Sequence, residues 1–239
     1  MTITTCVVLA AGAGTRLRDA AESKPLCAVA GTPLLDHAIE RLAAAGIRRV
    51  IVTTGYRAEA IEAHLAGRDW PVTVETARTI DWRQPNGVSA LAAAPLLDGA
   101  ETLLVMCDHL VEPALYARMA AAGAGQGLRL GIDRRLGHDW VDPLDVTCVA
   151  TDGDRITAIG KEMAPHDCYD TGVFAVGPHF FAALRGLPSP SITEAVRALI
   201  AQRTALTVDC SDLDWIDVDD PKALAAANAW LSGGRPAGV

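Results

Sequence analysis

The chain has 239 residues, of which 50% are hydrophobic, 21% charged and 5% aromatic, and its formal net charge is −8. This composition is typical of a globular protein and excludes a disordered chain, which has too few apolar residues to build a core. The 29 Asp and Glu outnumber the 21 Lys and Arg. A surface for nucleic acid or anionic membrane is therefore not expected, because it needs a basic face. A small ligand is the better expectation.

The amino terminus carries no signal for export or membrane insertion. Its first apolar run breaks at Gly12, well short of the roughly 20 residues that cross a bilayer, and no basic region precedes it. The six cysteines include no Cys-x-x-Cys pair, so neither a zinc knuckle nor a thioredoxin-type motif is expected. We expect reduced thiols, a cytoplasmic location, and neither a membrane nor a nucleic-acid partner.

The first half of the chain alternates β-branched runs with longer Ala- and Leu-rich segments of helical period. Strands are predicted over residues 4–9, 50–54, 72–75 and 102–106, and helices over residues 33–45, 58–66, 87–97 and 113–122. The strand at 4–9 is apolar on both faces, as strands covered by helices on each side are. The predicted fold class is α/β, with a doubly wound, mixed but mainly parallel sheet of the Rossmann-like kind.

After Leu128 the pattern changes to short alternating segments. Residues 146–150 and 156–160 are predicted as a hairpin, which we expect to form a small β insertion. Helices are predicted over 191–201, opened by a capping box of Ser191 and Glu194, and over 221–231, capped by Asp220. The predicted domain covers residues 1–231. Residues 232–239 have the composition of a linker, beyond which a further catalytic domain can be fused.

A loop of small residues follows the first predicted strand. Its sequence is Leu9-Ala-Ala-Gly-Ala-Gly-Thr-Arg-Leu17, and Lys24 lies shortly after it. The backbone N–H groups of such a loop can surround a triphosphate, while Arg16 and Lys24 supply positive charge to its oxygens. The expected nucleotide-binding positions here are Leu9, Ala10, Ala11, Gly12, Gly14 and Thr15. The alternative is that the two glycines only turn the chain.

Two other kinds of phosphate loop are disfavoured by the residues present. A dinucleotide fingerprint needs a third glycine where Leu17 stands, and no acidic residue closes the strand at 50–54. A Walker loop ends in Gly-Lys-Ser or Gly-Lys-Thr, whereas Thr15 and Arg16 follow Gly14. Because Leu17 replaces the third glycine of the dinucleotide fingerprint, a nicotinamide-dependent oxidoreductase is also disfavoured.

Taken together, the motifs resemble those of the sugar-phosphate nucleotidyltransferase family. Residues 9–17 match its amino-terminal signature, Leu-x-Ala-Gly-x-Gly-Thr-Arg-Leu with a downstream Lys-Pro. Four further regions fit along nearly the whole chain: Asn86-Gly-Val-Ser89, Met106-Cys-Asp-His109, Gly160-Lys-Glu162 with Asp170-Thr-Gly172, and Trp215-Ile-Asp-Val-Asp219. The set looks most like the small CTP-dependent branch. That branch includes inositol-1-phosphate cytidylyltransferases and the cytidylyltransferase domain fused to a phosphoenolpyruvate phosphonomutase in the fosfomycin pathway.

Asp108 follows the buried strand at 102–106, and ligands of open α/β sheets bind at the carboxyl ends of the strands. A carboxylate there can hold Mg²⁺, and a second from Asp217, with Asp219 close by, can complete the protein's share of the site. The alternative for Asp108 is a helix N-cap. The resemblance implies that Asp217 is a metal ligand. Cys107 departs from the glycine that the family more often has before this Asp.

The resemblance assigns the acceptor's phosphate to Lys161. A cation is needed where two anions meet, although a solvated surface lysine is the alternative. The resemblance further implies acceptor contacts from Asp170, Thr171 and Gly172, and His109 either joins them or is structural.

For three residues at the start of the predicted helix at 87–97, the sequence allows two alternative roles. They are Asn86, Gly87 and Ser89. Their amides and side chains either meet the nucleotide's base or ribose, or cap the helix.

The expected function is Mg²⁺-dependent transfer of CMP from CTP to a small phosphonate, with 2-hydroxyethylphosphonate the first choice, and release of pyrophosphate. Inositol 1-phosphate, or another phosphate ester, is the alternative acceptor. The acceptor oxygen is ionised near neutral pH, so no general base is required. A non-catalytic nucleotide-sensing relative of the same fold is the alternative from another class. The joint presence of Lys24, Asp108, Lys161 and Asp217 speaks against it.

Overall fold

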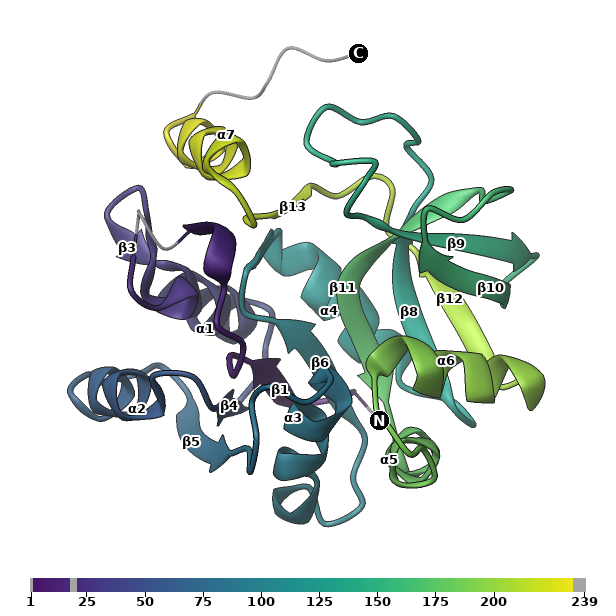
Figure 1. Ribbon diagram of the computed structural model, residues 1–239, viewed down its shortest axis with the longest axis horizontal. Coiled ribbons are helices and arrows are strands. Elements are labelled where there is room, and N and C mark those ends of the chain that lie inside the picture. Colours follow the sequence, from purple (N-terminus) through teal and green to yellow (C-terminus); the bar gives the residue numbers. More distant parts are fainter. Residues whose placement is uncertain (1, 18–20, 234–239) are drawn as a thin grey trace.

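The structure is a computed structural model that describes residues 2–17 and 21–233, and its first half alternates strands and helices as predicted (Figure 1). The strands are β1 (Thr5–Leu9), β4 (Arg49–Thr54), β5 (Thr73–Arg78) and β6 (Thr102–Met106). The helices are α1 (Leu34–Ala44), α2 (Ala58–Ala66), α3 (Asn86–Ala93) and α4 (Pro113–Ala122). Each predicted element of this half is present, with ends that differ by a few residues at most.

The second half contains elements that the sequence pattern did not predict. The predicted ones are β9 (Thr147–Asp152), β10 (Arg155–Lys161), α6 (Ile192–Ala201) and α7 (Pro221–Leu231). The elements of this half that were not predicted are β8 (Leu128–Asp133), β11 (Cys168–Val176), α5 (Pro178–Arg185), β12 (Ala205–Asp209) and β13 (Trp215–Asp217). Also not predicted is the short strand β7 (His109–Val111), which lies between β6 and α4. Apart from Ser232 and Gly233, the tail expected at 232–239 lies outside the described residues.

Short elements connect the larger ones. Two-residue strands β2 (Ala28–Val29) and β3 (Thr32–Pro33) pair with each other, and single helical turns cover Thr15–Leu17, Lys24–Leu26 and Ala94–Leu96. Both predicted helix caps are confirmed. Ser191 Oγ accepts from Glu194 N at 3.1 Å, and Asp220 Oδ1 accepts from Ala223 N at 2.7 Å. Within the described residues, no helix combines the length and apolar character needed to cross a bilayer.

Nine strands form one sheet in the order β5-β4-β1-β6-β11-β8-β12-β10-β9. The first four strands are parallel to one another, and β12 runs parallel to β8, whereas the other pairs, β6–β11 included, are antiparallel. The predicted mixed, doubly wound α/β sheet is confirmed, with most of its parallel pairing in the first half. The β9–β10 hairpin, expected as a small insertion, forms the edge of this same sheet, and β9 also pairs with β11.

Successive residues of the central strands enter two different cores, one on each face of the sheet. In β1, Cys6 and Val8 pack in the core that α1, α2 and α4 cover. Val7 and Leu9 pack in the core that α3, α5 and α6 cover. Burial on both faces explains why these strands read as continuous apolar runs. The layers of helices on the two sides of the sheet are visible in Figure 1.

A third, smaller core joins α7 to the amino-terminal segment and to a two-stranded sheet. It includes Leu17, Leu110, Ile216 and Ala227, with Trp230 packed against them. In the two-stranded sheet, β13 runs antiparallel to β7 and sets Asp217 opposite His109. This pairing carries the late acidic motif back to the carboxyl edge of the main sheet.

Candidate active site

The turn after β1 and the acid after β6 lie at the same edge of the sheet, because the two strands are parallel neighbours. Cys107 N donates to Leu9 O at 3.2 Å and fixes their relative position. The Cys107 side chain is buried in the core with α1 and α4, so its departure from glycine adds no bulk to the site. Asp108 does not cap a helix, since Glu112 precedes α4.

The glycine turn offers N–H groups to a ligand. Gly14 has φ +54°, and a Cβ there would lie 2.3 Å from Lys24 Cβ, so only glycine fits against the lysine stem. A Cβ at Gly12 would have no atom within 4 Å, which leaves open space above the backbone. The amides of residues 12–14 donate to no acceptor within residues 2–17 and 21–233. Leu9, Ala10 and Ala11 are themselves buried and can contribute only backbone groups.

Lys24 lies among the predicted metal-binding carboxylates. Its ammonium is 2.6 Å from Asp108 Oδ2 and 3.9 Å from Asp217 Oδ1, and it donates to Asp219. Only 6% of Lys24 is exposed. Burial alone would lower the pKa of Lys24, but Asp108 and Asp217 raise it by more, so the group stays charged. Burial also opposes ionisation of Asp108, yet Lys24 and His109 hold the pKa of Asp108 below its usual value.

His109 is fixed on three sides. Its Nδ1 is 2.9 Å from Thr171 O, its ring stacks on Trp215 at 5.8 Å, and its Nε2 is 3.5 Å from Asp217 Oδ2. Burial favours the neutral ring, but Asp217, with Asp108, outweighs it and raises the pKa of His109 to about 9. Gly172, at φ +75°, makes room for the ring, since a Cβ there would lie 2.2 Å from His109 Nδ1.

Of the other two residues of the Asp-Thr-Gly motif, Asp170 faces the cavity and Thr171 is buried away from it. Asp170 lines the cavity, and its Oδ1 accepts from Gly172 N at 2.7 Å. Burial raises the pKa of Asp170 to about 6. The predicted acceptor contact from the Thr171 side chain is wrong. This side chain is fully buried, and its hydroxyl donates to Gly131 O at 2.8 Å. Thr171 therefore presents no side chain to a ligand.

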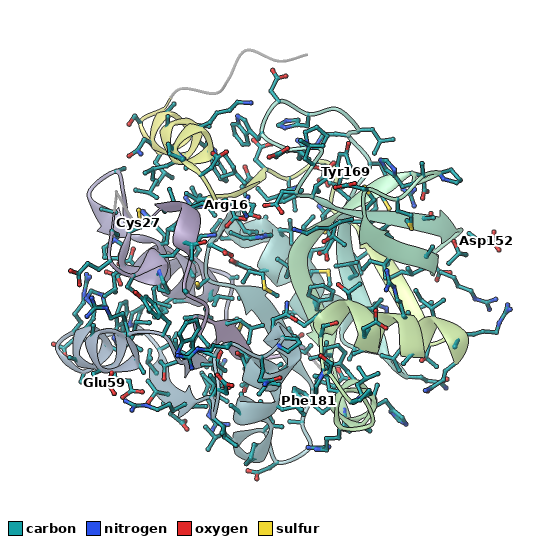
Figure 2. The ribbon with its side chains drawn as sticks, in the orientation of Figure 1. Arg16, Cys27, Glu59, Asp152, Tyr169 and Phe181 are labelled. Atoms are coloured by element: carbon teal, nitrogen blue, oxygen red, sulfur yellow. The ribbon has the colours of Figure 1, made fainter. Side chains whose placement is uncertain are left out.

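Asp145, which sequence analysis missed, bridges two of the predicted cations. Its Oδ2 accepts from Arg16 Nη2 at 2.5 Å, and its Oδ1 accepts from the Lys161 ammonium. Arg16 also donates to Asp219. Burial alone would raise the pKa of Asp145, but Lys161 and Arg16 hold it below the usual value. Lys161 is thus ion-paired within the site, although much of its side chain is exposed. Arg16 lies near the middle of the molecule, facing the β13–α7 segment (Figure 2).

The motif that opens α3 is mainly structural. Asn86 lines the cavity, but its Oδ1 accepts from Ile192 N at 3.0 Å and so ties α3 to the start of α6. A Cβ at Gly87 would lie 2.6 Å from Pro190 O, so the glycine permits close packing of these segments. Ser89 is buried. Asn86 does not cap α3, because Pro85 occupies the N-cap position without a side-chain hydrogen bond.

A cavity of about 330 Å³ takes in part of this set, whereas Lys24, Asp108 and the glycine turn lie outside its lining. Predicted residues in its lining are Arg16, Asn86, His109, Lys161, Asp170, Gly172, Asp217 and Asp219. Asp145, Trp140 and Lys222 also line it and were not predicted. Asp145 and Trp140 lie in the irregular segment between β8 and β9, where neither periodicity nor a motif indicated a functional residue.

The carboxylates fit a hard divalent cation. One oxygen each of Asp108 and Asp217 and a ring nitrogen of His109 lie within 4.8 Å of one another. Asp217 Oδ1 is buried and has no hydrogen-bond partner among the described residues. Carboxylate oxygens are the protein ligands that Mg²⁺ prefers, and an unpartnered buried oxygen is available for that purpose.

Residues 6–139 match the MobA-like NTP transferase domain. The chain belongs to this family. The predicted nucleotidyltransferase class is thereby confirmed. A solved structure described as the inositol-1-phosphate CTP transferase from T. maritima superposes with a TM-score of 0.83 and 22% identity, covering 99% of each chain, and supports the fold.

Three curated relatives share sequence along almost the whole chain. The bifunctional IPC transferase and DIPP synthase of Rubrobacter xylanophilus is 30% identical, over 97% of this chain and 52% of that protein. The CMP-5'-(3-aminopropyl)phosphonate synthase of Streptomyces rubellomurinus is 27% identical, over 90% of this chain and 37% of that protein. This family member thus spans about half, or less, of the length of these two. The N-acetylmuramate alpha-1-phosphate uridylyltransferase of Caulobacter vibrioides is 45% identical, over 95% of this chain and 96% of that protein.

Proposed function

We propose that the protein is a cytidylyltransferase that transfers CMP from CTP to a phosphate or phosphonate oxygen of a small acceptor and releases pyrophosphate. The observation that carries the proposal is the convergence of Asp108, in the turn after β6, and Asp217, in β13, beside the glycine turn after β1. The inositol-phosphate and aminopropylphosphonate relatives support cytidylyl transfer to a small acceptor.

The nucleotide end is assigned to the glycine turn and its neighbouring cation. The free amides of residues 12–14 bind triphosphate oxygens, and Arg16 adds a guanidinium that is half exposed toward the cavity. Lys24 offsets part of the negative charge of the carboxylates beneath, so a tetra-anionic ligand does not face their full charge. Asp108 and Asp217 would hold Mg²⁺, with Asp219 beside them in ion pairs with Lys24 and Arg16. When bound, Mg²⁺ supplies neutralising charge to the phosphates.

The acceptor end is assigned to Lys161, Asp170, Gly172 and His109. Lys161 binds the acceptor's phosphate or phosphonate and aligns one of its oxygens with the α-phosphorus of CTP. A P–O bond forms from this oxygen as the α–β bridging bond breaks, and pyrophosphate leaves. Because the attacking oxygen is already ionised, no residue has to remove a proton.

For the acceptor we propose a small phosphonate, with 2-hydroxyethylphosphonate first and inositol 1-phosphate as the alternative. Lys161 binds the anionic group common to both, and Asp170 accepts hydrogen bonds from donors on the remainder of the acceptor. A cavity of about 330 Å³ suits a compact acceptor.

Uridylyl transfer to a sugar 1-phosphate is the second candidate. It is favoured by the 45% identity with the uridylyltransferase of Caulobacter vibrioides, which this chain matches over nearly the full length of both. The same cations and carboxylates serve either reaction, so the two candidates differ only in base and acceptor.

A coupled pyrophosphate-release assay tests both. CTP, UTP, dTTP and GTP are each combined with 2-hydroxyethylphosphonate, 3-aminopropylphosphonate, inositol 1-phosphate, phosphocholine, glucose 1-phosphate and N-acetylmuramate 1-phosphate. We expect release only with CTP and a phosphonate or phospho-alcohol. Release with UTP and a sugar 1-phosphate alone supports the second candidate. Nucleotide binding without release from any pair supports the non-catalytic relative.

Asp108→Asn tests the site itself. The amide keeps the size of the side chain but loses its charge, so we expect kcat to fall by about a thousandfold, the scale of losing several kcal/mol of transition-state stabilisation. Circular dichroism checks that the fold is kept. A variant within a few-fold of wild-type kcat contradicts the assignment.

A further inference from the structure

Asp145 has an arrangement that the proposed reaction does not use. Both of its oxygens are engaged, Oδ2 by Arg16 and Oδ1 by Lys161, so one carboxylate joins two cations that come from distant parts of the chain. Its side chain is 19% exposed, whereas Arg16 and Lys161 are 51% and 59% exposed. The carboxylate thus lies deeper than the two cations that it holds.

The proposed reaction gives these two cations to different substrates. Arg16 belongs to the triphosphate and Lys161 to the acceptor, so the point between them is where the two phosphates react. A carboxylate offers two adjacent anionic oxygens, as a phosphate does, and both anions accept charge-assisted hydrogen bonds from Arg and Lys. Asp145 therefore makes with these cations the same kind of contacts that a substrate phosphate makes.

We propose that Asp145 is an internal competitor of the substrate phosphates for Arg16 and Lys161, and that its side chain leaves this position when they bind. The inference rests on the proposed function. Two negative charges a few ångströms apart in a partly buried site repel each other strongly. A phosphate between Arg16 and Lys161 consequently cannot share that position with the carboxylate. Each binding event must first break both ion pairs.

Asp145→Asn removes the competing charge and keeps the size of the side chain. We expect inorganic pyrophosphate, titrated by calorimetry at fixed Mg²⁺, to bind about three- to tenfold more tightly, because partly exposed ion pairs of this kind are worth up to about tenfold in affinity. We expect the KM for CTP and for the acceptor to fall similarly, with kcat within about twofold of wild type, since only binding is altered.

Two further variants make the comparison specific. Asp145→Glu keeps the competing charge, so it is expected to bind pyrophosphate no more tightly than wild type. Asp152→Asn makes the same change of charge at an exposed position at the tip of the β9–β10 hairpin, far from Arg16 (Figure 2), and is expected to leave the dissociation constant unchanged. Thermal unfolding of each variant confirms that it is folded.

Three outcomes overturn the inference. They are unchanged or weaker pyrophosphate binding by Asp145→Asn, equal gains for Asn and Glu, and a requirement for more Mg²⁺ at unchanged phosphate affinity. The last would make Asp145 a metal ligand, which its closeness to Asp217 and Asp219 allows. Failure of the proposed function is seen separately, because the wild-type protein then releases no pyrophosphate from any substrate pair.

Discussion

Charged side chains of alternating sign cross the site. They run in the order Asp108, Lys24, Asp219, Arg16, Asp145 and Lys161. Each charge lies against one of opposite sign, which offsets the cost of gathering ionised groups in a partly buried cavity. The three acidic residues of this row balance its three cations, so the row as a whole offers a phosphate no net positive charge. In the proposed reaction, binding of the anionic acceptor therefore depends on its local contact with Lys161 rather than on a general positive field.

Gly172→Ala is expected to displace His109 and weaken the acceptor site. A Cβ at Gly172 would lie 2.2 Å from His109 Nδ1, and φ is +75°. Steric overlap adds to backbone strain, so we expect the free energy of unfolding to fall by about 2 to 4 kcal/mol and the KM for the acceptor to rise. Urea denaturation and steady-state kinetics measure the two effects.

Gly153→Ala is the matched control for this substitution. Gly153 also has positive φ, at +63°, but a Cβ there meets no atom within 4 Å. Alanine at this position adds only the strain of the left-handed conformation, so the free energy of unfolding should fall by about 1 kcal/mol and the kinetics should be unchanged. If the free energy of unfolding fell equally in the two variants, the overlap with His109 would make no contribution to the loss of stability in Gly172→Ala.

At the level of elements, the sequence pattern was reliable where strands and helices alternate and each is apolar on its buried face. It failed for β11, a nine-residue strand at the centre of the sheet. The amino-terminal part of β11 contains Asp170 and Gly172, and pairing with β8 is irregular between Asp170 and Phe174. Polar residues and a glycine at such an irregularity are typical of a turn, so the motif concealed the strand.

The site was predictable in its residue types but not in its contacts. Motifs predicted that Asp108 and Asp217 meet at one site, and they do, but the pairing of β7 with β13 that brings them together involves two short strands with no local signal. Nothing in the sequence placed the Lys24 ammonium against three carboxylates, because that contact depends on how the turn packs on Gly14. Asp145 was missed because an acid in an irregular segment is ordinarily solvated.

Helices α1 and α2 are joined by a buried carboxylate. Asp36, with no exposed side-chain surface, accepts from His64 Nε2 at 2.6 Å and from Arg68. Arg68→Ala removes one partner from a carboxylate that cannot reach water. We expect the free energy of unfolding to fall by about 1 to 3 kcal/mol, less than for a fully isolated charge because His64 remains. Urea denaturation measures this change.

Arg78→Ala provides the comparison. Arg78 also pairs with carboxylates, but those of Glu59 and Glu62 keep contact with solvent. Because this ion pair is solvated, we expect its loss to lower the free energy of unfolding less than the loss of Arg68 does. If Arg78→Ala proved the more costly of the two, burial of Asp36 would not be what makes the α1–α2 contact important.

On the scale of the whole molecule, the site is assembled from segments between Arg16 and Asp219, and three apolar cores hold those segments together. The amino-terminal segment and α7 meet in the third core, with Trp140 from the β8–β9 segment packing on Trp230 at 5.1 Å. The walls of the cavity thus depend on contacts between the two ends of the described chain. A ligand that bridges Arg16 and Lys161 should stabilise the whole molecule.

Removal of divalent cations is expected to abolish activity without unfolding the protein. Lys24 already pairs with the acidic cluster and offsets part of its charge, and the cores form from apolar residues, so we expect folding not to require the metal. With EDTA we expect Tm to change by less than about 2 °C, whereas Mg²⁺ with CTP at about 100 times its Kd should raise Tm by about 5 to 10 °C. In Lys24→Met, by contrast, the carboxylates lose their internal cation, and Tm should become strongly dependent on Mg²⁺. Differential scanning calorimetry of both proteins decides the matter: a large loss of wild-type Tm in EDTA would mean that Lys24 does not replace the metal's charge.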